Sequence, residues 1–74
     1  LVRIAKNRFF LPATVADLAK LAQTLAAESV DGTFDAAQYR DRSGIGRNLT
    51  IQVLEFLDRM DVTRLAGDRR SVQS

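Results

Sequence analysis

The sequence contains no cysteine, no histidine and no tryptophan among its 74 residues. Without cysteine the chain forms no disulfide and offers no thiol nucleophile, and without histidine it lacks an imidazole base. A zinc site built from the usual cysteine and histidine ligands is excluded for the same reason. Neither an apolar run of about 20 residues nor a signal-peptide pattern is present, so we expect a cytoplasmic protein with no membrane partner. We therefore predict a binding module that is not an enzyme and holds no metal or cofactor.

What the sequence does contain is enough apolar material for one small core. A chain of this length buries only about 60% of the surface that its unfolded form exposes, so nearly every large apolar side chain is needed. Hydrophobic residues make up 46% of the chain and charged residues 27%, as in folded domains. The first residue is Leu1 rather than methionine. We expect residues 1–74 to be a single monomeric domain of a larger protein.

The basic residues are unevenly placed along the chain. The net charge is only +2. Residues 1–11, 40–47 and 62–74 are net basic, whereas the two segments between them are net acidic. Cations gathered on particular elements are typical of nucleic-acid binding. An ordinary solvated arginine surface remains open as an alternative.

Apolar periodicity predicts a first helix over residues 13–28. The preceding residues 8–11 read as a short extended run, closed by Pro12, which suits the first turn of a helix. Asp31 and Gly32 then form a turn signal.

A capping box predicts where the second helix begins. Asp35 is followed three residues later by Gln38, and Phe34 and Tyr39 stand where a hydrophobic staple would place them. Residues 33–34 read as extended before this start. Turn residues after Arg42 limit the helix to about two turns.

The last part of the chain predicts a third helix followed by a β-hairpin. Apolar residues recur at helical spacing over residues 47–60, and Asp61 ends the pattern. Residues 62–66 and 70–72 read as strands around the turn residues 67–69. The fold class we predict is mainly α with a small β-hairpin: a winged helix-turn-helix, with three helices plus a β-wing.

In this arrangement two basic places would face a nucleic acid: the junction between the second and third helices, and the wing. The third helix starts with Arg47 and Asn48, where free backbone N–H groups attract phosphate. An arginine at this end opposes the helix dipole, which favours a functional role over a stabilising one. The wing carries Arg69 and Arg70, and the end of the second helix carries Arg40 and Arg42.

Structural roles stay open for several of these residues. Arg40 has acidic neighbours with which it could pair, and Arg69 and Arg70 could be edge-strand charges that oppose aggregation. Asp58 and Asp61 are interpreted as a solvated surface. The four phenylalanines are expected in the core rather than as stacking platforms: Phe9, Phe10, Phe34 and Phe56.

Several motifs closely resemble the bacterial selenocysteine-specific elongation factor (SelB) family, specifically its last, fourth winged-helix domain. The strings that carry the resemblance occur in order as FDAAQYRDR (residues 34–42), IQVLEFLDR (51–59), VTR (62–64) and GDRR (67–70). The lead-in FLP at residues 10–12 adds to them. The similarity therefore covers nearly the whole chain.

This resemblance implies that the domain grips the apical loop of the selenocysteine insertion hairpin in mRNA. The residues it points to are Arg42, Arg47, Asn48, Arg69 and Arg70, with Arg40 as a further candidate. Asn48 departs from the pattern, because a second basic residue is expected beside Arg47. The resemblance also implies an upstream winged-helix domain, and GTP binding and ribosome contact in parts of the factor outside this chain.

Two other classes of function stay open from the residues themselves. A winged helix of a transcription regulator places its third helix in the DNA major groove. A protein-interaction module would use the same elements without any nucleic acid, since fold alone does not decide function. The preference for RNA over DNA comes from the family resemblance and not from charge or periodicity.

Overall fold

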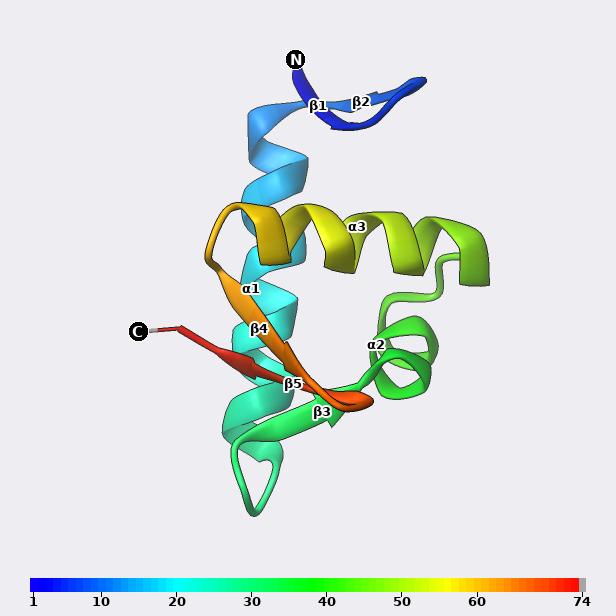
Figure 1. The fold of residues 1–74 in the computed structure, drawn as a ribbon. Coiled ribbons are helices and arrows are strands. Elements are labelled where there is room, and N and C mark those ends of the chain that lie inside the picture. The colour runs from blue at the N-terminus through cyan, green and yellow to red at the C-terminus, as the bar shows by residue number, and fades with distance from the viewer. Residues whose placement is uncertain (74) are drawn as a thin grey trace.

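The computed structural model describes residues 1–73, which form three helices and two small antiparallel sheets (Figure 1). The elements follow in the order β1 (Val2–Ala5), β2 (Arg8–Phe10), α1 (Pro12–Glu28), β3 (Thr33–Asp35), α2 (Ala36–Ser43), α3 (Arg47–Arg59), β4 (Thr63–Ala66) and β5 (Arg69–Val72). In Figure 1 α3 runs across α1, with the β1–β2 hairpin on one side of α3 and the β3-β5-β4 sheet on the other. This is a winged helix, as the sequence predicted.

The wing is the outer part of a three-stranded sheet. Strand β5 lies between β3 and β4, so that Arg70 stands opposite both Phe34 and Leu65. Gly67 closes the β4–β5 turn with a φ of +63°, a left-handed conformation that glycine adopts without strain. Since β5 is the central strand, the alternative interpretation of Arg69 and Arg70 as edge-strand charges is wrong.

Buried side chains from all three helices form the core. The largest of the fully buried side chains is Tyr39, and its ring stacks on Phe34 with the centroids 6.0 Å apart. The Tyr39 hydroxyl donates a hydrogen bond of 2.8 Å to the Leu18 carbonyl oxygen. Burial raises the pKa of this hydroxyl, which therefore stays protonated and satisfied. The predicted staple is confirmed, and it ties α2 to α1.

The predicted capping box is also confirmed. The Gln38 N–H donates to Asp35 Oδ1 and the Asp35 N–H donates to Gln38 Oε1, each over 2.8 Å. Gly44 ends α2 with a φ of +75°. Together these two ends keep α2 to eight residues and direct the chain into α3.

Asp35→Ala is expected to lower the free energy of unfolding by about 1 kcal/mol, because the Gln38 N–H at the helix start loses the carboxylate oxygen that caps it. Asp35→Asn is the matched control, since an asparagine oxygen caps a helix nearly as well. Urea unfolding of the three proteins measures the difference. Equal losses in both variants would show that capping is not what Asp35 contributes.

The first eleven residues differ from the prediction. The sequence indicated one extended run, whereas the structure has a β-hairpin in which β1 and β2 pair antiparallel. Ile4 reaches the core, being only 1% exposed. Phe9 was expected in the core but is 52% exposed, because successive strand residues point to opposite faces and Phe10 takes the inward one.

Met60 was expected on the apolar stripe of the third helix. It is 59% exposed, since α3 ends at Arg59 and Met60 lies just beyond the last turn. Within residues 1–73, none of the helices has the length and hydropathy to cross a bilayer.

Candidate nucleic-acid interface

The start of α3 is open to solvent. Gly46 precedes the helix with extended backbone and contributes no side-chain cap. The first hydrogen bond back to it comes from the Thr50 N–H, at 2.9 Å, so the N–H groups of the preceding helical residues point outward. Arg47 and Asn48 are both exposed here. Helix dipole, free N–H groups and a guanidinium together attract an anion at this place.

A hollow lies between the start of α3 and the start of α2. It has a volume of about 320 Å³ and is lined by Ala36, Ala37, Arg40, Arg47, Thr50 and Ile51. The alanines and Ile51 provide an apolar surface, and Ile51 is 40% exposed beside the two guanidinium groups. A small apolar surface bordered by cations suits the flat face of an unstacked base and its phosphate.

Arg40 is available to this hollow. Its only charged partner among residues 1–73 is the neighbouring Asp41, at 3.4 Å, and both side chains are well exposed. A surface pair of this kind contributes little and is readily exchanged for another anion. The pairing that the sequence left open is thus present but weak.

Arg42 is placed differently. Its two terminal nitrogens donate to the two carboxylate oxygens of Glu28 at 2.7 and 2.8 Å, which joins the end of α2 to the end of α1. These hydrogen bonds hold the pKa of Glu28 below its usual value. Arg42 lines another hollow with Leu25 and Gln38, so the structure does not bring it together with Arg47.

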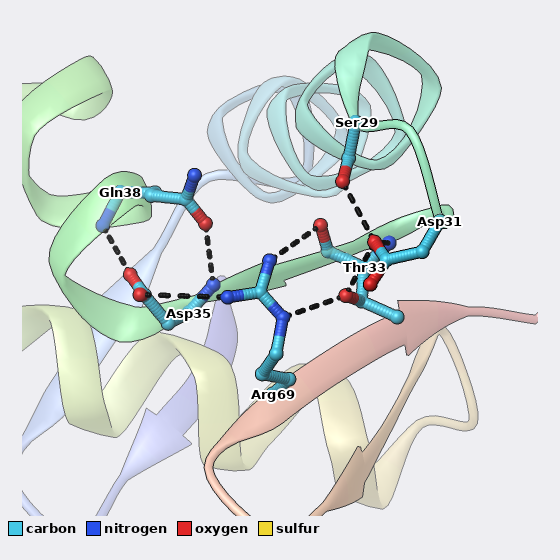
Figure 2. A network of polar contacts seen from close by, with 6 residues as sticks. All are labelled: Ser29, Asp31, Thr33, Asp35, Gln38 and Arg69. Carbon is cyan, nitrogen blue, oxygen red and sulfur yellow. Dashed lines mark hydrogen bonds and ion pairs between the residues drawn. The ribbon is translucent and has the colours of Figure 1, made fainter.

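Arg69 joins the central strand β5 to the neighbouring strand β3, at whose end α2 begins (Figure 2). Its Nε donates to Thr33 Oγ1 at 2.7 Å, one terminal nitrogen donates to the Thr33 carbonyl at 3.1 Å, and the other lies 3.8 Å from Asp35 Oδ2. Asp31 accepts from the hydroxyls of Thr33 and Ser29, and these bonds lower its pKa to about 2. Arg69 is therefore part of a polar network that supports the helix cap.

Arg70 is buried, with 8% of its surface exposed. Its Nη2 lies 2.9 Å from Asp58 Oδ2, and its Nε contacts both carboxylate oxygens at 3.2 Å. Burial alone would raise the pKa of Asp58, but the hydrogen bonds from Arg70 and Thr63 and the charge of Arg70 outweigh it, and the pKa is lowered. The expectation that Asp58 is a solvated surface carboxylate is wrong, because it anchors β5 to the end of α3.

The structure thus brings together two of the six sequence-predicted residues at the hollow, Arg40 and Arg47. Asn48 is exposed beside Arg47 at the start of α3 but does not line the hollow. Arg42, Arg69 and Arg70 are engaged by acidic partners elsewhere. Sequence reasoning missed the apolar lining of the hollow from Ala36, Ala37 and Ile51. Two features of the sequence could have indicated this hollow. The first turn of α2 contains the small residues Ala36 and Ala37, and the first turn of α3 contains no acidic residue.

Known proteins resemble this chain in both sequence and fold. A family model described as "Elongation factor SelB, winged helix" matches residues 26–72. That model is named after the third winged helix of the factor, so the expectation of a fourth, last domain stays a prediction.

Two curated relatives are selenocysteine-specific elongation factors. The one from Escherichia coli (strain K12) is 38% identical over 65 residues, which are 88% of this chain and 10% of the relative. The one from Haemophilus influenzae is 38% identical over 68 residues, 92% of this chain and 11% of the relative. The chain therefore spans about a tenth of the length of these factors.

A solved structure, that of the mRNA-binding domain of elongation factor SelB from E. coli in complex with SECIS RNA, is also similar. The TM-score is 0.90 at 34% sequence identity, over 99% of this chain and 59% of the other. Because the family model covers more than half of the residues and the whole fold agrees, the chain belongs to the SelB elongation factor winged-helix family.

Proposed function

We propose that this chain binds the apical loop of the selenocysteine insertion hairpin in mRNA and so tethers a selenocysteine-specific elongation factor for UGA recoding during translation. The observation that carries the proposal is the hollow between α2 and α3, with exposed Arg40 and Arg47 at its border. It occurs in a fold whose solved relative is a complex with SECIS RNA.

The start of α3 is the main contact in this proposal. A deep, narrow A-form major groove excludes a helix, whereas loop nucleotides can leave the stack and be bound singly. The free N–H groups and Arg47 hold the loop phosphates, and the hollow receives the face of one unstacked base. The Asn48 amide, beside Arg47, donates to a phosphate or a base edge without adding charge.

The other predicted arginines have secondary roles in the proposal. Arg42 and Arg69 are about half and two-fifths exposed and reach RNA only by sharing their guanidinium groups with Glu28 and Asp35. Arg70 acts through the fold, because its charge is already neutralised by Asp58 in a buried pair.

The remaining parts of the factor complete this function. We place GTP binding, ribosome contact and the connection to an upstream winged-helix domain in the roughly nine-tenths of the relatives that this chain does not cover. Within such a factor this chain acts as a monomeric, cytoplasmic RNA-binding module without a cofactor of its own.

Parallel titration of the 74-residue chain with a SECIS hairpin and with random duplex DNA of equal charge tests the function. We expect the hairpin to bind at least tenfold more tightly at matched salt. The log–log salt slope should be shallower than about 4, because only a few cations reach the RNA. Equal or tighter binding to duplex DNA would support the winged helix of a transcription regulator instead. The absence of any salt-dependent binding would support a protein-interaction module.

A further inference from the structure

We propose that the β1–β2 hairpin is a second RNA-binding surface, which binds the backbone phosphates of the stem below the loop. The inference rests on the proposed function, because the hairpin adds contacts to a complex whose loop is held at the start of α3. It assigns a role to Arg3, Lys6 and Arg8.

The hairpin is uniformly basic. Arg3, Lys6 and Arg8 are all exposed, and residues 1–11 contain no acidic residue. Lys6 lies in the turn between β1 and β2. No salt bridge involves any of these three side chains within residues 1–73. The positive charges that are compensated at Arg42, Arg69 and Arg70 are therefore uncompensated here.

An open hollow lies where the hairpin meets α3. It has a volume of about 740 Å³ and is lined by Arg3, Ile4, Ala5, Lys6, Gln52, Glu55 and Arg59. Three cations and one carboxylate border it, which leaves the hollow net positive. A hollow this open and polar suits a charged backbone rather than an apolar ligand.

The hairpin is held firmly against α3. Ile4 is packed into the core, and its carbonyl accepts a hydrogen bond of 2.8 Å from the Arg59 side chain. Arg8 Nε donates to Gln52 Oε1 over 2.9 Å. These contacts position the cations before any ligand binds, which reduces the entropy lost on binding.

The two surfaces are continuous along α3. Residues spaced by three or four form one stripe of the helix, which is exposed except at the half-buried Gln52: Asn48, Gln52, Glu55 and Arg59. The stripe begins beside Arg47 and ends at Arg59, roughly 18 Å farther along the axis at ~1.5 Å per residue. In Figure 1 the hairpin lies along this same helix and its tip extends over the N-terminal half. A stem that continues from a loop bound at Arg47 therefore passes the hairpin.

Glu55 offers an additional test of the inference, because it is the one carboxylate that lines the hollow. A carboxylate repels a phosphate at close range. Glu55→Gln is therefore expected to strengthen binding to an RNA that reaches the hollow, and to leave binding of a shorter RNA unchanged.

The experiment compares two RNA hairpins that share the loop but have stems of about 5 and about 12 base pairs. The variant is Arg3→Gln combined with Lys6→Gln. The matched control is Lys20→Gln combined with Arg64→Gln, which removes the same charge from exposed positions outside both surfaces. Circular dichroism establishes that all variants are folded.

We expect the Arg3/Lys6 variant to lose about three- to tenfold in affinity for the long stem at low salt, with a salt slope shallower by about 2. Affinity for the short stem should be unchanged in this variant, and the control should match the unmodified chain on both RNAs. An equal loss on both stems, the same loss in the control, or no loss at all would overturn the inference. The loop assignment is judged separately, by whether Arg47→Ala weakens binding of both stems.

Discussion

Arg47→Ala is expected to weaken binding of the SECIS hairpin by about 10- to 100-fold at matched salt, because it removes a charged hydrogen-bond donor from the centre of the interface. The side chain is exposed and borders the hollow between α2 and α3. Fluorescence anisotropy with a labelled hairpin measures the loss.

The same substitution should leave stability unchanged or slightly raised, since an arginine at the first position of a helix opposes its dipole. Thermal unfolding provides this control. Arg47→Lys keeps the charge but loses the paired donors of the guanidinium, and we expect an intermediate affinity. An unchanged affinity of Arg47→Ala would place the interface away from the start of α3.

Arg70→Met is expected to lower the free energy of unfolding by about 2–3 kcal/mol. The substitution leaves the carboxylate of Asp58, whose side chain is only 25% exposed, without its main partner. Urea unfolding measures the loss. In the double variant Arg70→Met with Asp58→Leu, we expect much of the stability to return, because an apolar pair often replaces a buried ion pair without loss.

The pH dependence of the free energy of unfolding at acidic pH provides a second measurement of this pair. The pKa of Asp58 is lower in the folded chain than its usual value, so the pair stabilises the fold fully above the unfolded pKa of about 3.9. This stabilisation is lost as the pH falls through the folded pKa. In Arg70→Met the free energy of unfolding should depend less on pH in this acidic range. An unchanged dependence would contradict the pairing of Arg70 with Asp58.

Arg70→Met also separates a structural role from RNA contact. If Arg70 acts only through the fold, affinity corrected for the folded fraction should equal that of the unmodified chain. A loss of RNA affinity that persists in fully folded protein would instead show that Arg70 contacts RNA, as the sequence predicted.

Local features were predictable because they depend on neighbours in the chain. The capping box at Asp35 and Gln38 uses residues three apart, and the staple of Phe34 and Tyr39 uses residues five apart. The apolar spacing predicted the end of α3 at residue 60, one residue beyond its observed end at Arg59. The β1–β2 hairpin was missed because two strands this short give little periodicity, and only pairing revealed which of Phe9 and Phe10 points inward.

The sequence by itself determined the order of elements from α1 onward, the winged-helix fold and the segments in which cations gather. Only the tertiary structure decided which of those cations are available. Arg42 meets Glu28 across 14 residues, and Arg70 meets Asp58 across 12, so their charges are neutralised by contacts that local spacing does not encode. Formal charge belongs to the residue type, but the field that a ligand meets depends on where folding places the counter-charge. That is why the start of α3 and the β1–β2 hairpin, rather than Arg69 and Arg70 of the wing, are left as open basic surfaces.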